Sequence, residues 1–346
     1  MKKRFLYLDL LRILAVIAVI IIHVTAEFWY ISPNDTLSWQ INNIFNSLSA
    51  WGVPVFIMIS GALLLPKEKK IEIKDIWFKY IPRMVLILFF WGVFYSLYEQ
   101  GSLTLSSLIV AFKYVIAGNA YSHLWYLYML IGLYVMLPIL KIITRSASKI
   151  ELEYMLIVGI LLISLVPMVL QVKQIALLKN TMSMLHMDIF GEFVIYFIMG
   201  YYLDKYRISK TNCNHLYIAT IVTVIFTVIS TIYFTYNAIE FSVASGIISP
   251  ASILMAVSIF LLAQNFETKI SENVNVAKKI TTSASLVFGI YLIHFLVEKE
   301  LLKLGVHSEM FNAFISVPVV TITIFVISYV LVWILYKVPI IRKILS

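Results

Sequence analysis

Long apolar stretches alternate with short polar connections along the whole chain of 346 residues. A helix needs about 20 residues to cross a hydrocarbon core about 30 Å thick, and ten stretches come close to that length. The pattern therefore predicts an all-α polytopic membrane protein with about ten transmembrane helices, folded as one membrane domain over residues 1–346. The predicted spans are residues 8–28, 41–65, 79–99, 121–141, 152–171, 187–204, 215–236, 246–264, 283–301 and 312–336.

The composition and the polar connections support this interpretation. Hydrophobic residues make up 61% of the chain and charged residues 13%, with a mean hydropathy of +0.93, whereas a soluble domain is about one-half apolar and one-quarter charged. Polar connections such as residues 66–78 and 265–282 are far too short to form independent domains. Residues 100–120 have an apolar centre too short to cross a bilayer, which predicts an interfacial or re-entrant helix. One cysteine, Cys213, excludes an internal disulfide and a cysteine-based metal cluster.

The positive charges set the predicted orientation. Cytoplasmic loops are enriched in Lys and Arg, and an orientation with both termini in the cytoplasm places 21 of the 27 Lys and Arg residues inside and five outside. The remaining one, Arg12, lies within the first span. A cleaved signal peptide is the rival interpretation of residues 8–28, but that run is too long, contains Arg12 and lacks a small-residue cleavage pattern. We therefore expect a true first span.

Arg12 and His23 lie within the long aliphatic run of the first span. They lie eleven positions apart, and at about 100° and 1.5 Å per residue they share one helical face about 16 Å apart. Arg12 then lies in the inner part of the bilayer and His23 in its outer third. Groups of this kind usually face a cavity or a partner. Arg12 could pair with Asp9 one turn earlier, and His23 could form only an interhelical hydrogen bond.

Several segments resemble one known family. Taken in order over nearly the whole chain, they are similar to the acyltransferase-3 family of membrane acyltransferases, and look closest to the stand-alone enterobacterial common antigen O-acetyltransferase type. They also resemble the membrane part of vancomycin-resistance serine racemases, although the chain has no appended hydrolase-like or racemase domain. The segments are the Arg12-to-His23 spacing, SWQINNIFNSLSAWGVPVFIMISGALLL (38–65), IPR (81–83), HLWYLYMLIGLYVMLP (123–138), GEFVIYFIMGYYL (191–203) and FGIYLIH (288–294).

The resemblance implies a membrane O-acyltransferase. Such an enzyme moves an acyl group, usually acetyl, from cytoplasmic acetyl-CoA or another acyl-CoA to a hydroxyl of an extracytoplasmic cell-surface sugar or glycolipid. We expect a multi-pass protein of a bacterial plasma membrane that contacts membrane lipids and needs neither a metal nor nucleic acid. The chain lacks HExxH, GxxxxGK[ST] and GxSxG motifs, which argues against a metalloprotease, an ATP-driven pump and a serine hydrolase.

For this reaction His23 is the expected catalytic residue, because histidine is the side chain poised to act near pH 7. It could deprotonate the acceptor hydroxyl, or carry the acetyl group itself as an acyl-imidazole. A carboxylate that holds the second ring nitrogen would help. Glu27 lies four residues on, whereas Glu192, in the segment GEFVIYFIMG, is expected level with His23 and is the stronger candidate; a plain interfacial carboxylate is its alternative role.

The donor is polyanionic, so its nucleotide end requires cations at the cytoplasmic opening. Arg83, which follows Pro82, matches the family's basic residue there, and Lys79 lies four residues earlier on the same face. Arg12 would lie deeper, against the pantetheine arm or the phosphates, or would hold the first helix through Asp9.

On the outer side the expected acceptor-binding residues are His123, Trp125, Tyr126 and Asn119, of which the aromatics could instead form an interfacial belt. His294 and Ser60 are possible tunnel residues. Structural hydrogen bonding and helix packing, respectively, are their alternative roles.

A secondary transporter or a flippase for a polysaccharide precursor is the alternative function, since such proteins also bury charged residues along a path. It would move an unchanged solute, whereas an acyltransferase consumes acyl-CoA. A non-catalytic membrane sensor, the third class, would tolerate the loss of His23.

Overall fold

The computed structural model describes residues 5–29, 31–170, 191–236 and 246–339, together with Arg342 and Leu345. The regular structure of these residues is entirely helical, which confirms the predicted all-α fold. The helices are α1 (Leu6–Ala26), α2 (Leu37–Ser49), α3 (Gly52–Leu64), α4 (Ile73–Asp75), the π-helix η1 (Ile76–Tyr80), α5 (Ile81–Gln100), α6 (Leu105–Ile116), the 3₁₀-helix η2 (Ser122–Leu124), α7 (Trp125–Ser146), α8 (Lys149–Ile160), the π-helix η3 (Leu161–Leu165), α9 (Val166–Leu170), α11 (Glu192–Lys205), α12 (Lys210–Tyr236), α13 (Pro250–Glu272), α14 (Val274–Lys303) and α15 (Ala313–Leu335).

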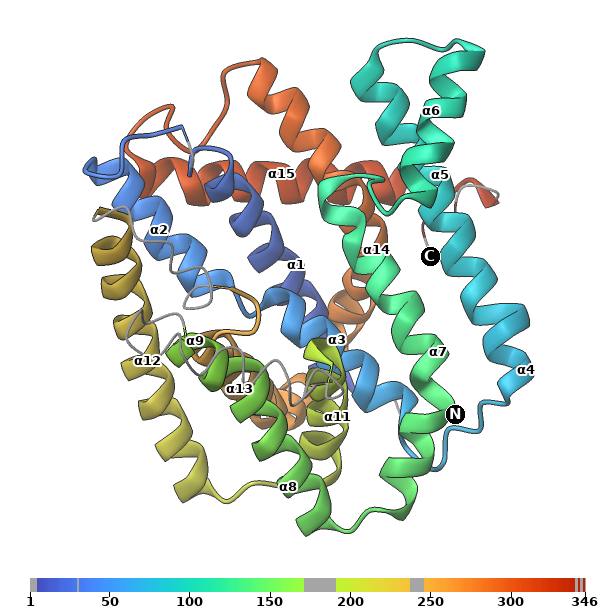
Figure 1. Cartoon of the computed structure of the whole chain (residues 1–346), viewed down its shortest axis with the longest axis vertical. Coiled ribbons are helices and arrows are strands. Elements are labelled where there is room, and N and C mark those ends of the chain that lie inside the picture. Colours follow the sequence, from blue (N-terminus) through green and yellow to red (C-terminus); the bar gives the residue numbers. More distant parts are fainter. Residues whose placement is uncertain are drawn as a thin grey trace.

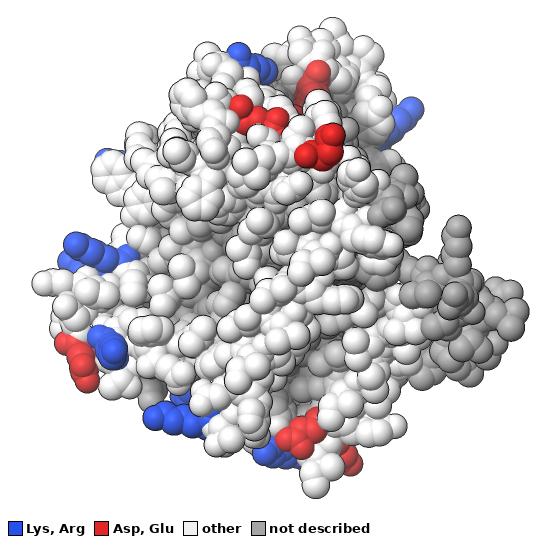
Figure 2. All heavy atoms as spheres, turned by 90° about the vertical axis from the view of Figure 1, so that its left-hand side faces the viewer, with Lys and Arg blue, Asp and Glu red and all other residues white. Residues whose placement is uncertain are grey.

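Nine helical stretches among the described residues are long and apolar enough to cross a membrane, against about ten predicted. The difference falls on the predicted span 187–204, where α11 has 14 residues and residues 187–190 lie outside the described part. The predicted span 41–65 is divided into α2 and α3 at residues 50–51. Figure 2 shows Lys, Arg, Asp and Glu around the edges of one face and an uncharged centre, as expected for a surface in contact with lipid.

Helix α1 lies at the centre of the bundle and packs against α2, α3, α13, α14 and α15 (Figure 1). Its first turn is fixed by two other helices. The Glu267 carboxylate of α13 accepts hydrogen bonds from the backbone N–H of Tyr7 at 2.7 Å and of Leu6 at 3.3 Å. The Tyr7 hydroxyl donates to Asp204 of α11. These bonds satisfy N–H groups that a helix start leaves without intrahelical partners, and they fix the rotation of α1.

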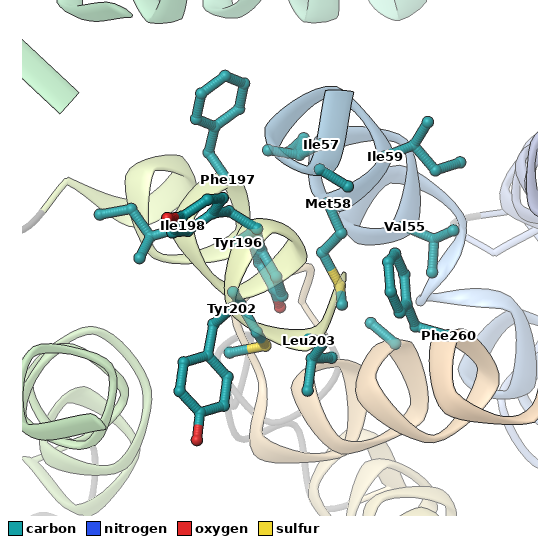
Figure 3. Packing of buried hydrophobic residues seen from close by; sticks show 14 of the residues in the cluster. Val55, Ile57, Met58, Ile59, Tyr196, Phe197, Ile198, Tyr202, Leu203 and Phe260 are labelled. Carbon is teal, nitrogen blue, oxygen red and sulfur yellow. The ribbon is translucent and has the colours of Figure 1, made fainter. Parts of the chain in front are cut away.

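Helices α3 and α11 cross at two glycines. A Cβ atom added to Gly61 would lie 1.7 Å from the carbonyl oxygen of Phe197, and one added to Gly200 would lie 1.9 Å from the carbonyl oxygen of Met58. Such a close backbone approach requires residues without side chains. Beside the crossing, Met58 lies between Tyr196 of α11 and Phe260 of α13 in a buried apolar cluster (Figure 3). The crossing therefore holds α3 in place against α1.

Polar residues in the short connections start several of these helices. The Thr36 hydroxyl accepts from the backbone N–H of Trp39 at the start of α2, and the Ser249 hydroxyl caps α13 immediately before Pro250. Each cap satisfies an N–H group at a helix start. The predicted helix within residues 100–120 is present as α6, after Gly101 ends α5 in the left-handed conformation at φ 61°.

Candidate active site

A cavity of about 190 Å³ lies between α1, α3, α7 and α14. Arg12 and His23 of α1 both line it, in agreement with the common helical face predicted from their spacing. Arg12 lines the end near the predicted cytoplasmic side. His23 lines the opposite end, together with His123 at the beginning of the predicted fourth span. The remaining wall is largely apolar, with Phe56 of α3 and Phe288 of α14 among its residues.

Three histidines from separate parts of the chain meet at the outer end of the cavity. The ring centroid of His23 on α1 lies 5.3 Å from that of His294 on α14 and 6.5 Å from that of His123 in η2, and the last two are 5.4 Å apart. His123 and His294 are buried, whereas His23 is half-buried and lines the cavity. Sequence spacing could place each histidine in its span, but it could not show that the three come together.

Tyr291 fixes two of these histidines. Its hydroxyl donates to the backbone oxygen of His123 at 2.7 Å, and its own backbone oxygen lies 2.6 Å from Nδ1 of His294. The second contact favours the tautomer of His294 that carries its proton on Nδ1, which leaves Nε2 as an acceptor. Nε2 is buried and has no hydrogen-bond partner within the described part of the chain.

The histidine cluster can transfer protons, because a neutral imidazole carries one N–H donor and one acceptor nitrogen. In the described residues, no group of three or more His, Cys, Asp or Glu side chains is arranged to hold a metal ion. An imidazole can also act as a base or a nucleophile.

At the other end of the cavity, Arg12 pairs with Asp9, with Nη1 2.5 Å from Oδ1. The pairing considered from the sequence is thus present, and it fixes the direction of the guanidinium. Asp9 is buried, while the Arg12 side chain is 30% exposed and lines the cavity. Part of the Arg12 side chain is therefore accessible from the cavity while it is paired with Asp9. Ser60 also lines the cavity and donates to the backbone oxygen of Phe56 at 3.0 Å.

Two of the predicted acceptor-binding residues besides His123 line the same cavity. Trp125 packs against Phe193 of α11 at a centroid distance of 5.5 Å, and Tyr126 packs against Tyr291 at the same distance. Asn119 is exposed in the loop before η2 and is not part of the cavity wall.

The structure does not bring the other predicted residues to the cavity. Arg83 in the first turn of α5 and Lys79 in η1 are exposed. Glu192 is exposed at the start of α11, and Glu27 forms an ion pair with Lys299 at 3.6 Å. Within the described residues no hydrogen bond or ion pair joins either carboxylate to His23. The predicted pairing of Glu192 with His23 is therefore absent from the described structure, because the direction of a side chain cannot be read from its position in a span.

Two residues near the histidines were missed in the sequence. Phe295 packs against His23 and His123 at centroid distances of 5.1 and 5.2 Å. Glu298, one turn beyond His294, is buried, and its Oε2 has no hydrogen-bond partner in the described part of the chain. An acidic residue in the apolar ninth span was the available signal for Glu298. Nothing in the sequence distinguishes Phe295 from the other aromatics of the spans.

Residues 5–337 match the model of the acyltransferase-3 family, which is described as an acyltransferase domain. No curated protein and no solved structure matches the chain.

Proposed function

Because the chain belongs to the acyltransferase-3 family, we propose that it is a membrane O-acyltransferase. It would move an acyl group, with acetyl as the first candidate, from cytoplasmic acyl-CoA to a hydroxyl of an extracytoplasmic sugar or glycolipid. One observation carries the proposal: a single cavity has Arg12 at one end and His23 and His123 at the other, with His294 buried beside these two histidines. The whole chain would form one membrane domain in a bacterial plasma membrane. Its resemblance to the enterobacterial common antigen O-acetyltransferase type supports a surface glycan as the acceptor.

The size of the cavity supports a particular placement of the donor. Pockets that enclose a drug-sized ligand have volumes of about 300–1,000 Å³, and this cavity has about 190 Å³. It can enclose the acyl thioester end of the donor but not the nucleotide. The nucleotide would remain at the cytoplasmic opening, where Arg12 and, farther out on the surface, Arg83 and Lys79 offer positive charge.

His23 would act on the thioester by one of two routes. As a base, it takes the proton of the acceptor hydroxyl while the oxygen attacks the carbonyl carbon, and it returns this proton to the departing thiolate. As a nucleophile, it loses its own proton to the thiolate, carries the acetyl group, and regains a proton when the hydroxyl attacks. Both routes form one ester, break one thioester and release free CoA thiol. Trp125 and Tyr126 would offer aromatic faces to the sugar.

The test uses native membranes that contain the acceptor pool, with the cytoplasmic face exposed to acetyl-CoA labelled in the acetyl group. We expect label in the lipid or glycan fraction with release of one CoA thiol for each label. Movement of an unlabelled, unmodified glycolipid without acetyl-CoA consumption would instead indicate a flippase or transporter.

Arg12 gives a prediction for the donor. Arg12→Gln removes a charge-assisted hydrogen-bond donor, so we expect KM for acetyl-CoA to rise by about tenfold or more while kcat changes less. Lys113→Gln, a change of an exposed lysine on α6, is the matched control and should leave KM unchanged. Steady-state kinetics in proteoliposomes measure both constants. An unchanged KM in folded Arg12→Gln protein would assign Arg12 to the Asp9 pair alone.

A further inference from the structure

One apolar side chain, Phe295 of α14, packs against the two histidines that line the outer end of the cavity. Its ring stacks on the ring of His123 with an interplanar angle of 7° and contacts His23 edge to face. The residue is only 8% exposed. The Phe295 ring therefore covers one side of the imidazoles of His23 and His123.

Four polar residues lie near Phe295, at the ends of their helices or connections. Tyr121, in the connection before η2, contacts the Phe295 ring at a centroid distance of 5.1 Å, and its hydroxyl donates to Glu99 near the end of α5. Lys299, one turn farther along α14, places its Nζ 5.6 Å from the centroid of the same ring and pairs with Glu27 near the end of α1. All four belong to the ends of elements that are predicted to face the extracytoplasmic side. Phe295 thus lies between the histidines and the outer water.

We propose that Phe295 is the specificity-determining residue that keeps water from His23 and so directs the acyl group to the acceptor. This inference rests on the proposed function. A histidine that activates a sugar hydroxyl can activate water as well, so an acyltransferase must exclude water from the thioester. Movement of the Phe295 ring would admit the acceptor, whose own apolar faces then exclude water.

Hydrolysis of acetyl-CoA is the reaction that competes with acyl transfer, and its rate is the quantity to measure. In hydrolysis, a water oxygen forms the new C–O bond to the acetyl carbon and the C–S bond breaks. One water proton passes through His23 to the thiolate, and the acetic acid that is formed releases the other to the medium. The products are acetate and free CoA thiol, and no acceptor is needed. Removal of the barrier should therefore raise the rate of this reaction, whereas general damage to the site would lower it.

The experiment measures CoA thiol released from acetyl-CoA by purified protein in liposomes that lack any glycan. For Phe295→Ala we expect hydrolysis to rise about tenfold over the wild type, and for Phe295→Leu a smaller increase, because water gains access to His23. Phe311→Ala, a change of an exposed residue of the α14–α15 loop, is the control and should hydrolyse at the wild-type rate. Adding His23→Ala to Phe295→Ala should return hydrolysis to background.

Wild-type hydrolysis rates in both Phe295 variants, with thermal unfolding close to that of the wild type, would overturn the proposal. If the alanine variant fails to fold, Phe295→Leu decides by the same measurement. Increased hydrolysis that persists in the double variant would also overturn it, because the water would then react elsewhere. Failure of the wild type to use acetyl-CoA with native membranes would instead refute the acyltransferase proposal, which separates the two.

Discussion

His23→Ala is expected to lower kcat for acyl transfer by about a hundredfold or more, while the protein stays folded. A positioned base contributes roughly a hundredfold to ten-thousandfold in rate, and either route through His23 loses its central group. Folding should persist because the half-buried ring lines a cavity rather than filling a packed core. Initial rates of label transfer in native membranes, with thermal unfolding of the same preparations, measure the two effects.

A control variant at another histidine and a chemical rescue experiment complete this prediction. His215 on α12 is exposed and lies outside the cavity wall, so His215→Ala should retain wild-type turnover. Free imidazole is small enough for the space that His23→Ala vacates, and it should restore part of the rate. Turnover above about one-tenth of the wild-type value in His23→Ala protein would remove His23 from the chemistry.

Gly200→Ala is expected to lower the free energy of unfolding by about 3 kcal/mol or more, a large effect for one methyl group. The new Cβ would lie 1.9 Å from the carbonyl oxygen of Met58, so α3 and α11 must separate. Because α3 also carries Phe56 and Ser60 of the cavity wall, we expect acyl transfer to fall as well. Gly61→Ala should act in the same way, since it meets the backbone of Phe197.

Gly132→Ala in α7 is the matched control. No atom lies within 4 Å of a Cβ added there, apart from the neighbours that any helix provides. Alanine is favoured over glycine inside a helix by roughly 0.5–1 kcal/mol, so this variant should be as stable as the wild type or more so. Thermal unfolding in detergent, followed by tryptophan fluorescence, compares the three variants. Equal thermal unfolding midpoints for Gly200→Ala and Gly132→Ala would contradict the prediction, because the helix crossing would then accommodate the added methyl group without loss of stability.

Hydropathy was enough to predict the helical membrane fold, because a bilayer admits few ways to satisfy the backbone. It did not show the division of residues 41–65 into α2 and α3, for which Gly52 and Pro54 in the first turn of α3 were the available signals. The close crossing at Gly61 and Gly200 depends on how α3 and α11 pack together, which cannot be predicted from the sequence of either helix alone.

The same distinction holds for the candidate site: relations within one helix could be predicted, and relations between helices could not. Arg12 and His23 belong to one helix, so their shared face followed from helical geometry, and both line the cavity. His123 and His294 come from other spans, and only the folded bundle shows that they surround His23. Glu192 was expected beside His23 but is exposed at the start of α11, because the sequence does not show which way a side chain points.

The most direct test of the account is the side from which the donor enters. Sealed vesicles of the two orientations are supplied with acetyl-CoA, which does not cross a bilayer, and label transfer to the glycan or lipid fraction is followed. We predict transfer in inside-out vesicles, where the Arg12 end of the cavity faces the donor, and none in right-side-out vesicles until they are opened with detergent. Transfer from the extracytoplasmic face of sealed right-side-out vesicles would contradict the account.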